Sequence, residues 1–129
     1  MPARFRGQLS DGIVLVAGLD PCVQLFTPRG YDEFSDKFIG RLNPLSRKGR
    51  MMTLRFNASA ADESLDSAGR VRIARHLIEH AGLDGPCVVV GALDHLEVWN
   101  PKRWAEHYSE IDAQAEQMAE ELAAGPGSD

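Results

Sequence analysis

Several features that mark other classes of protein are scarce in this chain of 129 residues. It has two cysteines, no apolar run of the roughly 18 residues that span a bilayer, and no apolar segment at its start. We therefore expect a cytoplasmic protein, neither bound to a membrane nor secreted with disulfides. Cys22 and Cys87 are expected to be reduced and buried.

Catalytic motifs are also lacking. The sequence contains no Gly-x-Ser-x-Gly, no P-loop and no dinucleotide-binding fingerprint. His76 and His80 have a spacing that can hold a metal on a helix, but no Glu follows His76 and no cysteine pair lies nearby. Asp94-His95 falls in a predicted hairpin turn, where turn chemistry accounts for it. The sequence therefore predicts no enzyme, no metal site, no cofactor and no small-molecule substrate.

Lysine and arginine are absent from residues 105–129, which hold seven acidic residues. The net charge of −5 comes from this end, and residues 1–104 carry a net charge of +2. Residues 41–61 contain no acid and five basic residues, Arg41, Arg47, Lys48, Arg50 and Arg55. Such a stripe is typical either of a solvated linker or of a protein that binds a polyanion.

The chain contains an internal repeat. Residues 11–31 align without a gap on residues 84–104, at an offset of 73 residues. The identical pairs are Asp11/Asp84, Gly12/Gly85, Val16/Val89, Gly18/Gly91 and Pro28/Pro101. A repeat of this kind indicates one supersecondary unit used twice. Residues 62–73 have no counterpart before the first copy. We expect that counterpart to lie upstream of residue 1, and the alternative is a natural variant that has only one such segment.

The pattern of apolar residues and turn signals predicts a mixture of strands and helices. Strands are expected at 13–17, 23–26, 63–65, 71–73, 86–90 and 96–99, and helices at 29–42, 75–81 and 102–123. Thr27-Pro28 and Asn100-Pro101 are both typical helix starts. Residues 43–61 are compatible with helix or loop. The last helix has an apolar stripe, expected to pack on the core with room for a subunit contact: Trp104, Tyr108, Ile111, Ala115, Met118 and Leu122.

The segment Asp66-Ser-Ala-Gly-Arg70 lies between two of these predicted strands. Asp66 can accept hydrogen bonds from backbone groups that follow it, and Gly69 can take the positive φ of a tight turn. Arg70 and Arg72 would then project to the same side of a strand, where guanidinium groups suit phosphate or base-edge contacts. From these residues alone, a structural hairpin and a functional one are equally compatible with the pattern.

The order of motifs in the second half resembles that of the MraZ family of bacterial transcriptional regulators. The resemblance rests on Leu-Asp-Ser-Ala-Gly-Arg-Val-Arg-Ile at 65–73, Ala-Gly-Leu at 81–83, Val-Val-Val-Gly at 88–91 and His-Leu-Glu-Val-Trp at 95–99. It implies an α+β fold, with two tandem AbrB/MraZ-like repeats that form a double-split β-barrel with flanking helices. The implied parts are an incomplete first repeat at 1–42, a basic linker at 43–61, a second repeat with a C-terminal helix at 62–123, and a tail at 124–129.

The resemblance also implies a function. Members of the family bind direct repeats in the promoter of the division and cell-wall gene cluster, and they assemble into rings. Carried over to this chain, Asp66 and Gly69 would shape a turn from which Arg70 contacts double-stranded DNA near the nucleoid, with Arg72 added as its neighbour. Arg47, Lys48 and Arg50 are further candidate DNA contacts.

The chain departs from the family pattern at three places. Ala74 stands where Pro is usual, Ile78 stands where Arg is usual, and the first copy has no Asp-x-x-x-Arg element. An antitoxin-like protein-binding module of the same broad fold is the alternative, in which the acidic helix near the C-terminus covers a partner.

Overall fold

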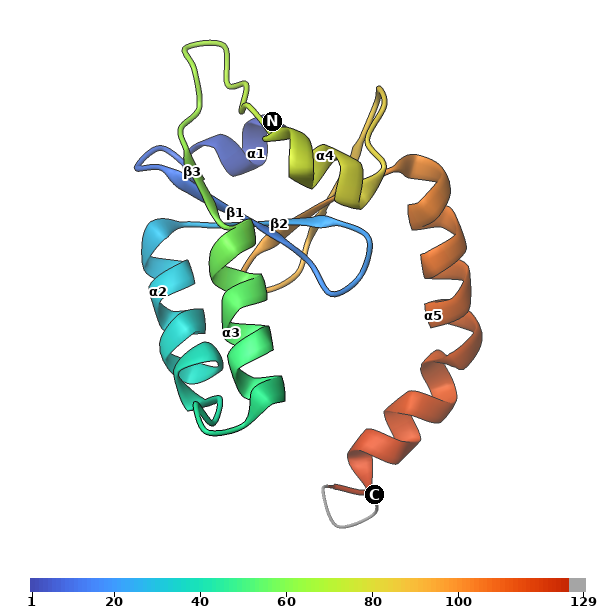
Figure 1. The fold of residues 1–129 in the computed structure, drawn as a ribbon. Coiled ribbons are helices and arrows are strands. Elements are labelled where there is room, and N and C mark those ends of the chain that lie inside the picture. Colours follow the sequence, from blue (N-terminus) through green and yellow to red (C-terminus); the bar gives the residue numbers. More distant parts are fainter. Residues whose placement is uncertain (126–129) are drawn as a thin grey trace.

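The computed structural model describes residues 1–125, which fold around a single β-sheet (Figure 1). The elements in chain order are α1 (Ala3–Arg6), β1 (Ile13–Ala17), β2 (Val23–Phe26), α2 (Pro28–Lys37), the 3-10 helix η1 (Ile39–Arg41), α3 (Arg47–Ser59), β3 (Ala61–Glu63), α4 (Arg75–Ala81), β4 (Val88–Gly91), β5 (Leu96–Trp99) and α5 (Pro101–Ala123). The predicted tail falls mostly at 126–129, outside the described residues. The predicted α+β class is confirmed.

The sheet is antiparallel, with the strand order β3-β1-β2-β5-β4. Two hairpins, β1–β2 and β4–β5, are joined side by side through β2 and β5, where Gln24 lies opposite Glu97. This arrangement is one continuous five-stranded sheet among the described residues, and the double-split barrel stays a prediction.

Both faces of the sheet are covered by helices. Every residue of β1 is buried, because alternate side chains enter two different clusters. Ile13 and Leu15 pack in the cluster that includes Leu77 of α4, while Val14 and Val16 pack in the cluster under α2 and α3. Figure 1 shows α1 and α4 on one side of the sheet and α2 and α3 on the other. A continuous apolar run thus produces a central strand buried on both faces.

The predicted helix starts are confirmed. The Thr27 hydroxyl accepts a hydrogen bond from the Gly30 N–H at 2.9 Å, and Asn100 Oδ1 accepts from the N–H groups of Lys102 and Arg103. The first helix is shorter than expected, because α2 ends at Lys37 and η1 follows. Residues 43–61, left open between helix and loop, contain α3.

Four predictions about local structure are wrong in detail. The strand expected at 63–65 lies at 61–63, the strand expected at 86–90 lies at 88–91, and the strand expected at 71–73 does not form. Residues 71–73 lack a ladder partner among the described residues, and a strand requires one. Both thiols are free, as expected, but only Cys22 is buried and Cys87 is exposed.

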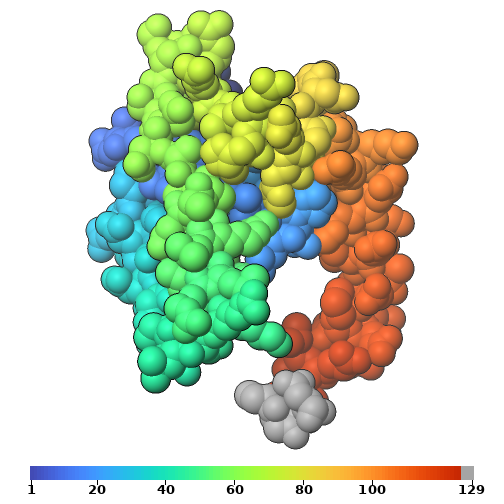
Figure 2. Space-filling view, in the orientation of Figure 1, coloured from blue at the N-terminus to red at the C-terminus, as the bar shows by residue number. Residues whose placement is uncertain are grey.

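Helix α5 leaves the domain after its first turns (Figure 1). Trp99 at the end of β5 is buried and contacts the rings of Trp104 and His107, with centroids 5.5 and 4.7 Å away, which fixes the start of the helix. Farther along, Tyr108 is 52% exposed and no residue of α5 is buried. The expectation that the apolar stripe packs on the core is therefore wrong beyond the first two turns. Figure 2 shows an opening between α3 and the middle of α5, which narrows toward the far end of the helix.

Candidate nucleic-acid interface

The Asp66–Arg70 turn lies at the end of a loop that leaves the sheet after β3 and returns at α4 (Figure 1). Leu65 before the turn and Val71 and Ile73 after it are half-buried and pack against the core cluster next to α4. Both stems of the turn are thus anchored by apolar side chains, although the second stem is not a strand. The turn itself is presented to solvent.

Asp66 organises the turn through its carboxylate. Oδ1 accepts hydrogen bonds from the backbone N–H groups of Ala68 and Arg70, both at 2.9 Å. Oδ2 accepts from Arg70 Nε, also at 2.9 Å. The backbone closes the turn with hydrogen bonds from the Asp66 N–H to the Arg70 carbonyl and from the Gly69 N–H to the Asp66 carbonyl. Gly69 has a φ of 74°, the positive value that was predicted.

The charge pair in the turn favours the ionised carboxylate. The N–H of Arg70 has the largest effect in holding the pKa of Asp66 below its ordinary value, with the Arg70 side chain and the N–H of Ala68 adding to it. The hydrogen bond from Nε to Asp66 orients the Arg70 side chain, which remains 79% exposed. The two terminal nitrogens of Arg70 have no partner among residues 1–125, so both can donate to an anion.

Arg72 lies on the same side of the chain as Arg70. Exposed and half-buried residues alternate from Arg70 to Ile73, as in an extended segment with one face on the core. The prediction that both arginines sit on a β-strand is wrong, because residues 71–73 pair with no strand in the described chain. Their common direction comes from the packing of Val71 and Ile73.

The other three predicted contacts lie elsewhere. Arg47, Lys48 and Arg50 are exposed in the first turn of α3, and β3 and the Asp66–Arg70 turn follow its other end. A helix of 13 residues is about 20 Å long, so the structure does not bring these residues to the turn. Arg50 Nη1 also donates to the Pro44 carbonyl at 2.9 Å, and Arg55 donates to the carbonyls of Ala17 and Gly18.

One basic residue that sequence reasoning missed does reach the turn. The side chain of Arg6, in α1, lies directly against Gly69: a Cβ at position 69 would meet Nε, Cζ and Cδ of Arg6. Arg6 Nε donates to the Met1 carbonyl at 2.9 Å. No local pattern signals this contact, because the two residues are far apart in the chain and only the fold brings α1 to the turn.

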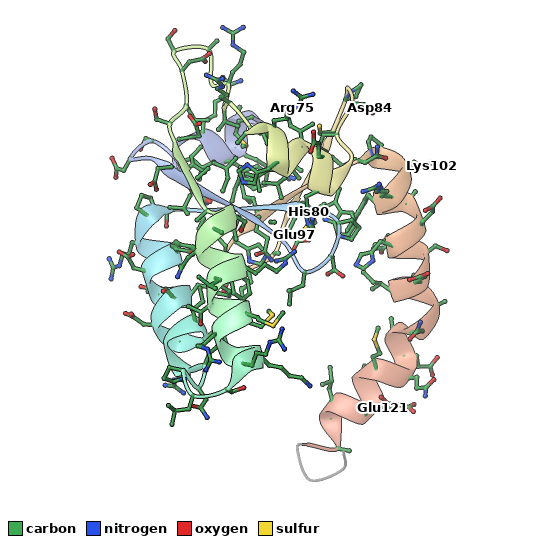
Figure 3. All side chains as sticks on the ribbon, viewed as in Figure 1. Arg75, His80, Asp84, Glu97, Lys102 and Glu121 are labelled. Carbon is green, nitrogen blue, oxygen red and sulfur yellow. The ribbon has the colours of Figure 1, made fainter. Side chains whose placement is uncertain are left out.

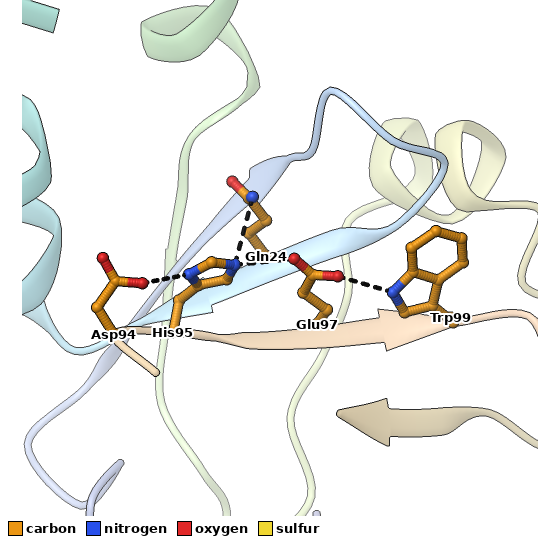
Figure 4. A network of polar contacts seen from close by, with 5 residues as sticks. All are labelled: Gln24, Asp94, His95, Glu97 and Trp99. Atoms are coloured by element: carbon orange, nitrogen blue, oxygen red, sulfur yellow. Dashed lines mark hydrogen bonds and ion pairs between the residues drawn. The ribbon is translucent and has the colours of Figure 1, made fainter. Parts of the chain in front are cut away.

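A second polar cluster lies where the two hairpins meet (Figure 4). His95 Nδ1 is 2.7 Å from Asp94 Oδ1, and His95 Nε2 is 2.9 Å from Glu97 Oε2. Glu97 also accepts a hydrogen bond from the Trp99 indole, and Gln24 lies 3.4 Å from His95 Nε2. His95 therefore does more than form a turn, because the register of β2 and β5 directs it to the junction between the hairpins.

The histidines that could have held a metal make separate contacts. His76 Nε2 lies 3.0 Å from the Ser59 carbonyl, and His80 Nε2 lies 3.1 Å from the Asp20 carbonyl. Figure 3 shows His80 in the middle of the molecule, and Arg75 at the end that carries the Asp66–Arg70 turn. Within residues 1–125 no three His, Cys, Asp or Glu side chains are grouped to hold a metal ion. The same residues contain no helix long and apolar enough to cross a membrane.

The fold and the site together define a class: a small α+β protein whose sheet supports a braced, solvent-exposed arginine turn. Comparison with known proteins agrees with this class and narrows it. A family model described as "MraZ protein, putative antitoxin-like" matches residues 56–124, which include α4, β4, β5, α5 and the Asp66–Arg70 turn.

Curated relatives match over nearly the whole chain. A protein of Roseiflexus castenholzii is 39% identical over 123 residues, covering 95% of this chain and 85% of the relative. Proteins of Moorella thermoacetica and Thermobifida fusca are 37% and 34% identical, covering 95% and 97% of this chain and 85% and 87% of each relative. Each is named "Transcriptional regulator MraZ". The chain belongs to the MraZ family.

Proposed function

We propose that this chain is a transcriptional regulator that binds promoter DNA in a sequence-specific manner through the Asp66–Arg70 turn. The observation that carries the proposal is the arginine held by its own turn: Asp66 accepts a hydrogen bond from Nε of Arg70, and the terminal nitrogens have no hydrogen-bond partner among residues 1–125. A guanidinium edge presented in this way matches a phosphate or the O6/N7 edge of guanine. The names of the relatives support a role in transcription.

In this proposal the residues have separate roles. Asp66 and Gly69 shape the turn, Arg70 contacts a base or a phosphate, and Arg72 contacts the neighbouring phosphate. The exposed Arg47, Lys48 and Arg50 would contact a more distant stretch of DNA or none. The chain acts in the cytoplasm at the nucleoid, and it requires no cofactor, metal or small-molecule substrate.

We further propose that the target is a set of direct repeats in the promoter of the division and cell-wall gene cluster, bound by a ring of subunits. One Asp-x-x-x-Arg turn per subunit makes few contacts, but a ring places several turns on one DNA molecule and raises the effective concentration of each. The exposed apolar side chains of α5 support a contact between subunits.

The first test is a gel shift on the DNA upstream of the gene, at two salt concentrations. Arg70→Ala is expected to weaken specific binding by about tenfold to a hundredfold, because a charged hydrogen-bonding contact to DNA is lost. Arg29→Ala is the matched control, since Arg29 is an exposed arginine on α2 that pairs with Glu33 at 3.4 Å. Equal binding by the Arg70→Ala and Arg29→Ala variants would exclude the Asp66–Arg70 turn as the DNA contact.

An antitoxin-like protein-binding role is the second candidate. The description of the matching family model supports it, and so does the projecting acidic helix α5. Helix α5 is continuous over 23 residues and capped by Asn100, whereas segments that wrap around a partner tend to be disordered before binding. Failure of the folded chain to bind the upstream DNA would favour this second role.

A further inference from the structure

A second arginine side chain lies against the Asp66–Arg70 turn. The side chain of Arg6, from the short helix α1 near the N-terminus, lies against Gly69 of the turn. The contact is close enough that any Cβ at position 69 would displace the Arg6 side chain, with Arg6 Cδ only 2.8 Å from it. Gly69 is buried in the structure although the turn around it is exposed. Gly69 is thus needed both for its positive φ and for the seating of Arg6.

Arg6 and Arg70 use their guanidinium groups in the same way. Arg6 donates its Nε to the Met1 carbonyl and Arg70 donates its Nε to Asp66, each at 2.9 Å. The terminal nitrogens of Arg6, like those of Arg70, have no partner among residues 1–125. Two guanidinium groups therefore lie at one turn, and the terminal nitrogens of each can donate hydrogen bonds to a ligand.

The charge at this end of the molecule is strongly one-sided. Residues 1–10 and 64–75 together contain five arginines and one acid, Asp66. That carboxylate is bonded to Arg70, and Arg75 pairs with Glu79 at 3.2 Å, whereas Arg4, Arg6 and Arg72 have no ion pair among residues 1–125. Cations held next to each other without enough acids repel one another, and an anion bound between them removes that cost.

We propose that Arg6 is a further DNA-binding residue, which contacts a backbone phosphate beside the one or the base that Arg70 contacts. The inference rests on the proposed function and adds to it a second segment of the chain. Gly69 acts as a positioning residue for Arg6, because it leaves the space in which the Arg6 side chain lies. The bound group is a phosphate of double-stranded DNA, and the contact is independent of sequence.

The test measures DNA affinity by fluorescence anisotropy, with a labelled fragment of the upstream DNA and a scrambled fragment, over a series of salt concentrations. Arg6→Gln is expected to weaken binding to both fragments by about tenfold and to lower the slope of log K against log salt by about 1. Arg6→Lys should restore the slope and part of the affinity, because it keeps the charge but not the planar fork. Arg29→Gln should change neither quantity.

A second variant tests the role of Gly69. Asn tolerates positive φ, so Gly69→Asn keeps the turn accessible and adds the Cβ that displaces Arg6. It is expected to weaken binding about as much as Arg6→Gln, and the double variant should be no weaker than either single one. Additive losses in the double variant would overturn the positioning role of Gly69.

The outcomes separate the two proposals. If Arg70→Ala loses specific binding while Arg6→Gln binds as the unmodified chain does, the inference about Arg6 is wrong and the proposed function stands. Loss of affinity in Arg6→Gln with an unchanged salt slope would also overturn it, because Arg6 would then only support the turn. Absence of DNA binding by the folded, unmodified chain would overturn both proposals.

Discussion

At the scale of single residues, one exposed carboxylate holds the conformation of the turn. Asp66 accepts three hydrogen bonds, two from backbone N–H groups and one from Arg70. Neighbouring residues also shape the turn: the side chains of Leu65 and Val71 anchor its two stems, and the backbone of Gly69 takes the positive φ. In the proposed function the acid would contribute to DNA binding without touching DNA, because its hydrogen bond to Arg70 orients the guanidinium before binding.

Substitution of Asp66 separates these contributions. Asp66→Asn keeps an oxygen for the two N–H donors but loses the acceptor of Arg70 Nε, so DNA affinity should fall by a few fold; Asp66→Ala loses both and should weaken binding about tenfold. Anisotropy titrations measure the difference, with Ser67→Ala as the control. Equal affinities of the Asn and Ala variants would contradict this account.

The same carboxylate makes the turn depend on pH. Since the pKa of Asp66 is lowered in the folded protein, the stabilisation of the turn by Asp66 is complete above the ordinary carboxyl pKa and is lost as pH falls through the lowered value.

At the scale of elements, the two hairpins are joined by a charged cluster. His95 lies between Asp94 and Glu97, stacks on Phe26 with ring centroids 5.1 Å apart, and faces Gln24 of β2. The hydrogen bond to Glu97 has the largest effect in raising the pKa of His95, and the bond to His95 does most to lower the pKa of Glu97. Burial and the nearby acids Glu97 and Asp20 raise the pKa of Cys22, which keeps this thiol protonated.

This cluster gives the fold a defined dependence on pH. The contribution of His95 is complete below its ordinary pKa of 6.5 and is lost as pH rises through the raised value. The contribution of Glu97 is complete above its ordinary pKa of 4.5 and is lost as pH falls through the lowered value. The pair therefore stabilises the fold most between these two ordinary values.

We expect His95→Gln to lower the free energy of unfolding by about 1 kcal/mol near pH 6, a figure reduced for partial solvent screening. The difference between the unmodified chain and the variant should shrink as pH rises above 6.5. Urea titrations across the pH range measure it, and His80→Gln is the control because His80 contacts only a backbone carbonyl. A difference that grows with pH would show that His95 is neutral in the fold.

The elements that could be predicted are those with a local physical signal. The β-branched run at Ile13–Ala17 and the Thr27-Pro28 and Asn100-Pro101 caps correctly predicted β1, α2 and α5. The strand at 71–73 was wrong because extended geometry and alternation do not supply a ladder partner. In the same way, the turn around Gly69 could be predicted from the residues between Asp66 and Arg70, but the contact between Arg6 and Gly69 could not, because it depends on the packing of α1.

At the scale of the whole molecule, two exposed surfaces have opposite charge. Helix α5 carries acids and exposed apolar residues, including Tyr108 and Leu122, and no Lys or Arg follows Trp104. Helix α3 carries basic residues and exposed Met51 and Leu54, and it contains no acid. Within one chain an opening lies between α3 and the middle of α5 (Figure 2). Contacts between α5 of one subunit and α3 of the next would bury the exposed apolar residues of both helices and bring their opposite charges together.

A ring built in this way makes a specific prediction. Leu54→Glu, in which an acid replaces an exposed apolar residue on α3, should raise the concentration at which subunits dissociate by about tenfold or more, because it removes apolar contact and adds repulsion with α5. Light scattering over a dilution series measures the change. Leu19→Glu, an exposed leucine in the β1–β2 turn, is the control. An unmodified chain that stays monomeric at high concentration would rule out the ring.

The order of strands in the sheet also bears on how the chain folds. Each hairpin pairs residues close in the sequence, whereas β2 and β5 pair residues 71 to 75 positions apart, such as Val23 with Val98. Closing so long a loop costs entropy before any contact compensates it. We therefore expect the hairpins to form early and their union through β2 and β5 to limit the rate of folding. The junction that carries His95 and Glu97 would then form late in folding, and it is also the part of the finished sheet expected to depend on pH.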